Sequence, residues 1–214
     1  MRRRRLCGVA LAALVPSLQT GCALPPPPPP RPIPPNSKLF AGAPAVAGPR
    51  LRGRVALLDT PDVRTATKLT VSYLFALQVG PMVEQALVLA LDGGLQGGVQ
   101  QVGAMPPAGS PFDAVLELRW VQLDFRRHVY PPRTVALDFD LRVVDGQGRA
   151  AWSRIYHDAK EHSLGELLAL VEPGETALET EVRLAHEAAW RLAQQVLHDL
   201  REWLAVERLR PREL

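Results

Sequence analysis

A proline-rich segment near the N-terminus limits what this chain can fold into. Residues 25–35 contain nine prolines, and the exceptions are Arg31 and Ile33. Proline fixes φ and has no N–H to donate, so it continues neither a helix nor a central strand. We therefore expect a polyproline II rod, which at about 3.1 Å per residue would reach roughly 34 Å over these eleven residues. Such a rod serves either as a spacer or as a docking site for proline-recognition domains, and we interpret it as a spacer.

The residues before the rod have the order of parts found in an export signal. Four arginines at positions 2–5 are followed by an apolar run over residues 6–18, and then by small or uncharged residues up to Cys22. A membrane-spanning helix needs about 20 apolar residues, so this run is too short to cross a bilayer. We interpret residues 1–21 as a signal peptide.

The residues around Cys22 resemble the lipobox of bacterial lipoproteins. The stretch reads LQTGC, and Gly21 and Cys22 match the pattern best. The resemblance implies cleavage before Cys22, acylation there with palmitate among the chains, and a durable membrane anchor. Ala23 follows the cysteine in place of an aspartate, which resembles the outer-membrane class facing the periplasm. The alternative is an ordinary signal peptide with a chance cysteine nearby.

Cysteine usage agrees with lipidation. The chain has two cysteines, and Cys7 lies inside the expected signal peptide, so the mature chain would keep Cys22 alone. A single cysteine in an exported protein forms no internal disulfide. Acylation would consume its thiol.

The net charge gives no reason to expect nucleic acid as a partner. The full chain has 25 Lys and Arg against 22 Asp and Glu, a net charge of +3, but four of the basic residues belong to positions 2–5. The mature chain would have 21 basic and 22 acidic residues, a net charge of −1. A near-neutral domain lacks the basic excess that nucleic-acid binding requires.

The rest of the sequence predicts one α+β domain. We expect a lipidated N-terminus and linker over residues 22–52, the domain over 53–206 and a tail over 207–214. The predicted elements are strands over residues 54–59, 112–125, 134–145 and 149–162, a helix from Pro81 to about Leu91 with the apolar face Met82, Val83, Ala86, Leu87, Ala90 and Leu91, a helix over 176–206, and connectors over 60–68 and 93–100. This order predicts a mainly antiparallel sheet with two helices packed on one face.

The strand predicted over residues 112–125 changes the phase of its apolar positions. They are even-numbered up to Trp120 and then odd-numbered at Val121, Leu123 and Phe125. A β-bulge near Trp120 would return all of them to one core. Otherwise Val121, Leu123 and Phe125 form a candidate surface that receives a lipid chain or a partner strand.

The histidines offer little chemistry. His157 and His162 belong to the one cluster that invites a metal, but their spacing turns them apart on a strand or on a helix. Four polar residues are expected on the water-facing side of the last helix: His186, Glu187, His198 and Asp199. We find no convergent acid, base and nucleophile in the sequence, and we expect no metal, no cofactor and no enzyme activity.

The order of elements resembles small bacterial envelope lipoproteins. The motifs that carry the resemblance are GRVALLD, GPMVEQALVLAL, DAVLELRWVQLDF, VVDGQGR and AAWRLAQQVLHDLREWL. They are similar to the YajG-like family and to the auxiliary lipoproteins of ABC-type lipid transport systems, the PqiC-like group. The resemblance implies a non-catalytic binding or assembly module with envelope proteins as partners, or alternatively a subunit of a lipid transporter. A periplasmic hydrolase or metal protein is a third class, which rests on the cluster of His157 and His162.

Overall fold

The computed structural model describes residues 28–41, 46, 48–71, 73–126, 134–163, 165–166, 169 and 171–209. The expected signal peptide and Cys22 lie outside these residues. The last helix continues to Leu209, so the expected tail at 207–214 begins too early.

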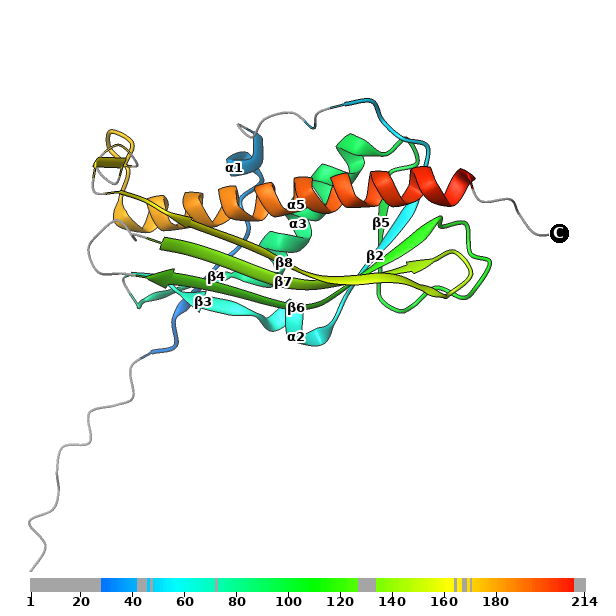
Figure 1. Cartoon of the computed structure of the whole chain (residues 1–214). Helices are drawn as coiled ribbons and strands as arrows, with labels where there is room; N and C mark the ends of the chain where they lie inside the picture. The colour runs from blue at the N-terminus through cyan, green and yellow to red at the C-terminus, as the bar shows by residue number, and fades with distance from the viewer. Residues whose placement is uncertain are drawn as a thin grey trace, which may run out of the picture.

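The centre of the domain is a five-stranded mixed sheet (Figure 1). Its strands, in spatial order, are β5 (Val99–Val102), β2 (Val55–Asp59), β6 (Ala114–Arg126), β7 (Thr134–Asp145) and β8 (Ala150–Glu161). β2 pairs in parallel with β5 and β6, whereas β6, β7 and β8 form an antiparallel meander. β7 lies in the middle of that meander because every second residue is apolar and buries one face of the strand. The predicted strands are confirmed, and β5 lies where we expected a connector.

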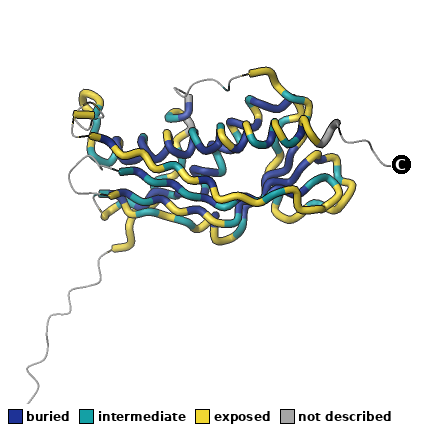
Figure 2. The backbone as a smooth tube through the Cα atoms, in the orientation of Figure 1, coloured by how far each residue is buried: buried dark blue, intermediate teal, exposed yellow. Residues whose placement is uncertain are grey.

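Two helices cover one face of this sheet, α3 (Val79–Gly94) and α5 (Ala177–Leu209) (Figure 1). The main core lies between the helices and the sheet, as the dark-blue segments in Figure 2 show. All residues predicted for the apolar face of α3 are buried, and Pro81 stands in its first turn, where a missing N–H is tolerated. Phe139 and Leu141 of β7 are fully buried, and Trp203 of α5 packs against the same core. The predicted α+β class, with two helices on one face, is confirmed.

A second, three-stranded sheet joins the N-terminal segment to the domain. Its strands are β1 (Arg31–Ile33), β4 (Phe75–Gln78) and β3 (Thr67–Leu69), in that order. β1 pairs in parallel with β4, and β3 pairs with β4 in the antiparallel sense. Pro32 is accommodated because β1 is an edge strand, where a missing N–H breaks no central ladder.

The expected linker over residues 22–52, and with it the expected rod over residues 25–35, is therefore wrong from Arg31 onward, where β1 pairs with β4. Beyond β1, the short helix α1 (Ser37–Ala41) packs on α5, and the side chain of Phe40 is only 6% exposed. The folded domain thus begins by Arg31, not near Gly53. A second short helix, α2 (Pro61–Thr65), replaces another expected connector and is capped by the Thr60 side chain.

A β-bulge in β6 explains the change of phase in its apolar residues. The register against β7 shifts between Leu118 and Trp120, so both Arg119 and Trp120 lie on the outer face of the sheet. Trp120 is 42% exposed, although its even position placed it with the inward set. Val121, Leu123 and Phe125 belong to the main core and are at most 7% exposed. The candidate surface formed by these three residues is therefore wrong, and the bulge alternative is confirmed.

The last helix is covered on two sides, which the sequence did not predict. His186 was expected to face water, but it is 1% exposed and its ring lies 4.9 Å from that of Phe40, centroid to centroid. Asp199 was also expected in water, yet it accepts hydrogen bonds from β8. Glu187 and His198 are exposed as expected. α1 and β8 bury additional residues of α5. The spacing of apolar residues along α5 does not indicate these contacts, because His186 and Asp199 are polar.

Candidate functional site

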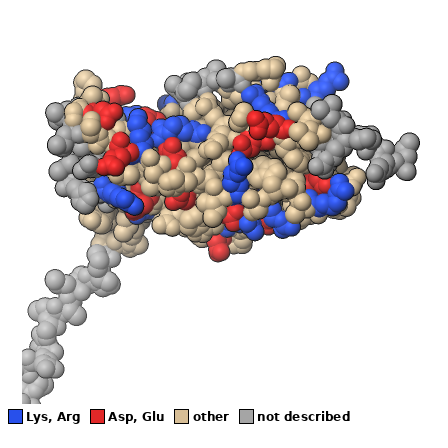
Figure 3. Space-filling view, viewed as in Figure 1, with Lys and Arg blue, Asp and Glu red and all other residues tan. Residues whose placement is uncertain are grey.

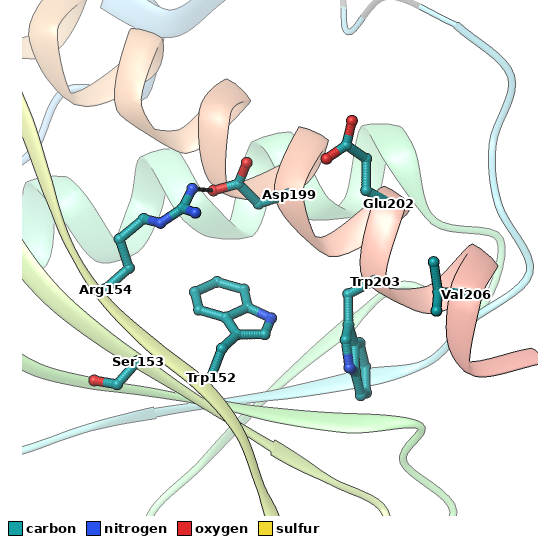
Figure 4. Close-up of a pocket in the computed structure, with 7 residues that line it drawn as sticks. All are labelled: Trp152, Ser153, Arg154, Asp199, Glu202, Trp203 and Val206. Atoms are coloured by element: carbon teal, nitrogen blue, oxygen red, sulfur yellow. Dashed lines mark hydrogen bonds and ion pairs between the residues drawn. The ribbon is translucent and has the colours of Figure 1, made fainter. Parts of the chain in front are cut away.

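A groove of about 380 Å³ lies between β8 and the C-terminal part of α5 (Figure 4). The residues that line it are Trp152, Ser153, Arg154, Asp199, Glu202, Trp203 and Val206. The first three belong to β8 and the other four to α5. The groove therefore depends on the packing of one edge of the sheet against one end of a helix.

The floor of the groove is aromatic. The indoles of Trp152 and Trp203 lie across from one another in Figure 4, one from each element. Trp152 lies beside Tyr156, at 6.2 Å between ring centroids, and Tyr156 stacks on Phe139 at 5.2 Å. The row of three rings thus connects the groove to the buried core, which fixes Trp152 in place. Val206, 55% exposed, extends the apolar surface along α5.

The charged groups beside the groove are paired with one another. Asp199 accepts a hydrogen bond from Arg154 Nη1 at 2.5 Å and another from the Tyr156 hydroxyl at 2.7 Å. Burial and the hydrogen bond to the Asp199 carboxylate raise the pKa of Tyr156 far above its ordinary value, so its hydroxyl remains a donor. Glu202 lies 3.3 Å from His198 on the exposed side of α5. These contacts hold β8 on α5.

β8 is an edge strand, and this adds a second feature to the site. The order of the sheet ends at β8, so no described strand pairs with its outer edge over the whole of its twelve residues. Such an edge presents a row of backbone donors and acceptors to any extended segment. Ile155 lies on the outer face of this strand and is 65% exposed. It continues a cross-strand row from Trp120 through Asp140.

The surface around the site is mixed in charge. Figure 3 shows basic and acidic side chains interspersed over the visible face, without a large area of one sign. On the outer face of the sheet, Arg119 pairs with Asp140 at 2.7 Å and Arg142 with Glu117 at 3.5 Å. A surface of this kind gives no electrostatic steering toward a polyanion.

The histidines of the sequence analysis do not form a shared site. His157 lies on the outer face of the sheet and pairs with Asp138, whereas His162 follows the end of β8 and is 2% exposed. Burial lowers the pKa of His162. Among the described residues there is no group of three or more His, Cys, Asp or Glu side chains placed to hold a metal ion.

The two tryptophans of the groove were not singled out from the sequence as site residues. A signal was present, because Trp152, Arg154 and Tyr156 alternate on a predicted strand and so share one face. Trp203 lies on the side of the last helix that packs against the core. Nothing in either element indicated that the two indoles line one groove, since their placement depends on how α5 crosses the sheet.

None of the described helices is long and apolar enough to cross a membrane.

No family model matches the sequence, and no curated protein matches it. Among solved structures, the chain is similar to protein XCC0632 from Xanthomonas campestris, a DUF330 protein, with a TM-score of 0.52 and 12% identity over 85% of this chain and 98% of that chain.

Two further structures have lower TM-scores. A minor lipoprotein from Acinetobacter baumannii has a TM-score of 0.40 and 16% identity, over 70% of this chain and 91% of that chain. The PelC dodecamer from Paraburkholderia phytofirmans has a TM-score of 0.38 and 14% identity, over 69% of this chain and 91% of that chain. At such identities a likeness concerns the fold alone, and the fold of this chain is similar to that of XCC0632.

Proposed function

We propose that this protein is a bacterial lipoprotein, anchored in the outer membrane through acyl chains on Cys22, that faces the periplasm and binds a partner without catalysis. The anchor is supported by the export signal and by Cys22, the one cysteine left after cleavage. The binding role rests on one observation: in the groove between β8 and α5, two indoles form an apolar floor and the neighbouring charges are already paired.

Binding suits the groove better than catalysis does. A general base must be within reach of a substrate proton and have a pKa near the working pH. Of the two carboxylates that line the groove, Asp199 is paired with Arg154 and Tyr156, and Glu202 lies 3.3 Å from His198. Tyr156 holds its proton strongly. Aromatic side chains in a partly covered groove are, by contrast, the usual anchors of an interface.

The free edge of β8 indicates the form of the partner. An extended polypeptide that adds to a sheet edge gains main-chain hydrogen bonds, and its alternate side chains enter neighbouring pockets. A segment paired along β8 would direct every second side chain toward α5, where Trp152 and Trp203 lie. We therefore propose an envelope protein with an apolar extended segment as the partner.

The second candidate is an auxiliary subunit of an ABC-type lipid transport system. The observation that favours it is the apolar lining of the same groove by Trp152, Trp203 and Val206. A lining of this kind accepts an acyl chain as well as it accepts an apolar side chain. The two candidates differ in what would be bound, a polypeptide or a lipid.

The anchor is tested by metabolic labelling with radioactive palmitate followed by fractionation. The natural chain should be labelled and recovered with the outer membrane, and Cys22→Ser should be unlabelled and leave the membrane fraction. A labelled chain in the inner membrane would contradict the location, and an unlabelled chain would contradict the anchor.

The groove is tested with Val206→Glu, which places a charge on the apolar floor at a residue that is already 55% exposed. The matched control is Leu89→Glu, 39% exposed on α3 and absent from the lining. Affinity purification from crosslinked envelopes should recover a polypeptide with the natural chain and Leu89→Glu, but not with Val206→Glu. Solvent-extractable phospholipid with the same dependence would support the transport candidate. Equal recovery by all three chains would overturn the groove as the binding site.

A further inference from the structure

The loop between β3 and β4 exposes bulky apolar side chains. Tyr73 is 68% exposed and Leu74 is 64% exposed, and Leu69, at the end of β3, is 43% exposed. Isolated apolar residues on a surface are common, but three large ones at one loop are an unusual concentration. We call Leu69, Tyr73 and Leu74 the apolar tip.

Hydrogen bonds tie the described backbone beside the apolar tip, at Thr70, Val71 and Tyr73, to its neighbours. The Val71 N–H donates to Glu181 Oε2 at 2.8 Å, and Glu181 is a fully buried residue of α5. The Tyr73 N–H donates to the Thr70 carbonyl at 3.0 Å, and the Thr70 N–H donates to the Phe75 carbonyl at 3.0 Å. The tip therefore presents its side chains from a defined platform, which is tied to the longest helix of the domain.

Tyr73 has an unfavourable backbone conformation. Its φ is 55°, and it is the only described residue other than glycine with a positive φ. Side chains with a Cβ, and aromatic ones above all, rarely adopt this conformation. A glycine would fit the turn without strain. The turn retains a strained tyrosine whose ring faces water, and such strain is often associated with a functional contact.

The apolar tip lies where the N-terminal segment enters the domain. The Arg31 N–H donates to the Leu74 carbonyl at 2.8 Å, and Arg31 pairs with Phe75 in the ladder of β1 and β4. Cys22 precedes Arg31 by nine positions. Nine residues span at most about 30 Å when fully extended, so an anchor at Cys22 keeps the tip close to the membrane. Figure 1 shows β1 and β3 at the same end of the molecule.

We propose that Tyr73 and Leu74 insert into the headgroup region of the phospholipid membrane to which the chain is anchored. This inference rests on the proposed acylation of Cys22. Tyrosine is suited to this depth because its ring is apolar and its hydroxyl is polar. The exposed Arg31 beside the tip adds an attraction to anionic headgroups. Two attachments, the acyl chains and the tip, then set the orientation of the domain, with its other end directed away from the bilayer.

The experiment depends on the absence of a free thiol in the expected mature chain. Cys7 would be removed with the signal peptide and Cys22 would carry acyl groups, so Leu74→Cys gives the mature protein one free thiol. This thiol is labelled with an NBD fluorophore, whose emission shifts to the blue in an apolar setting. The purified full-length lipoprotein is reconstituted in vesicles of phosphatidylethanolamine and phosphatidylglycerol, with and without doxyl-labelled lipid as a quencher.

The matched control is Gln147→Cys, labelled in the same way. Gln147 lies in the exposed turn after β7, at the opposite end of that strand from Thr134. The apolar tip belongs to the Thr134 end, because Lys68 of β3 pairs with Asp124 at 2.8 Å and Asp124 lies opposite Ala136. The twelve residues of β7 separate the two ends by about 40 Å. We expect blue-shifted, doxyl-quenched emission at position 74 and neither effect at position 147.

The outcomes are distinct. Mass spectrometry that finds no acyl group on Cys22 overturns the proposed function, and the tip proposal with it. An acylated chain whose probe at position 74 is quenched no more than the control overturns the tip proposal alone. Blue-shifted emission at position 74 without doxyl quenching would mean that another part of the chain covers the tip, and this also overturns it. Introducing Tyr73→Asp beside the probe should reduce the quenching, whereas Leu89→Asp should not.

Discussion

The backbone N–H of Asn36 donates a hydrogen bond to Nε2 of His186 at 3.2 Å, across 150 positions of the chain. The other ring nitrogen, Nδ1, lies 2.7 Å from the Val182 carbonyl. A carbonyl accepts and an N–H donates, so both bonds form only when the ring is neutral and carries its proton on Nδ1. The hydrogen bond that ties Asn36 to α5 therefore requires a neutral histidine.

This requirement predicts that the domain loses stability in mild acid. Burial lowers the pKa of His186 below its ordinary value of 6.5. As the pH falls below 6.5, the unfolded chain takes up the proton first, so the free energy of unfolding decreases until the folded-state pKa is reached. Urea denaturation at about pH 7 and about pH 5 measures this loss.

The control for this prediction is His186→Phe, which keeps a ring against Phe40 but cannot titrate. The buried His162 has a lowered pKa as well and contributes its own pH dependence. The expected result is therefore a smaller loss of stability between the two pH values in His186→Phe, not a complete absence of loss. An identical loss in the two proteins would show that His186 does not carry the effect.

Two glycines of α3 should respond differently to a methyl group. A Cβ on Gly80 would lie 1.7 Å from the backbone oxygen of Val63, whereas one on Gly94 would lie 2.4 Å from the end of the Leu197 side chain. A side chain moves more easily than a backbone carbonyl, so Gly94→Ala should cost about 1–3 kcal/mol and Gly80→Ala more. Gly103→Ala, with no atom within 4 Å, should change the free energy of unfolding little. If urea denaturation showed a larger loss of stability for Gly94→Ala than for Gly80→Ala, the close packing of α2 on α3 would be contradicted.

The register of β7 predicts opposite effects at neighbouring positions. Phe139 is fully buried and stacks on Tyr156, so Phe139→Ala should lower the free energy of unfolding by about 3–5 kcal/mol. Asp140 lies on the outer face, where its pair with Arg119 is partly exposed, and Asp140→Ala should cost about 1 kcal/mol or less. Equal effects measured by thermal or urea unfolding would mean that the strand is shifted by one residue.

The bulge in β6 predicts a similar contrast. Leu123 is 3% exposed in the main core, and Leu123→Glu would bury a charge without a partner, which should unfold the domain or nearly so. Trp120→Glu is the control, because Trp120 is 42% exposed on the other face. Trp120→Glu should keep the circular dichroism spectrum of the natural chain and unfold cooperatively on heating. A folded Leu123→Glu would restore the earlier hypothesis of an exposed surface at Val121, Leu123 and Phe125.

The sequence was sufficient to predict the elements whose burial is regular. The alternation in β7 and the 3.6-residue spacing in α3 each report a single covered face, and both predictions are confirmed. The phase change in β6 was visible too, but two structures were compatible with it. Only the pairing with β7 shows that Arg119 and Trp120 share the outer face.

The elements that were missed are short or depend on distant partners. β1 contains a proline in a proline-rich segment, and its strand conformation comes from pairing with β4, more than forty positions later. His186 was assigned to water because the apolar stripe of α5 accounts for only one covered side, whereas α1 supplies another. The groove was missed for the same reason, since Trp152 and Trp203 come from separate elements.

The pairing of β1 with β4 also determines how the domain responds to force. Tension on the chain before Arg31 acts along the axis of β1, and the hydrogen bonds of a parallel pair lie across that axis. Such tension loads these bonds together in shear and does not open them one after another. β4 runs directly into α3, so the load passes into the core of the domain and not into a surface loop. A pull on the N-terminal segment would therefore meet the mechanical resistance of the fold itself.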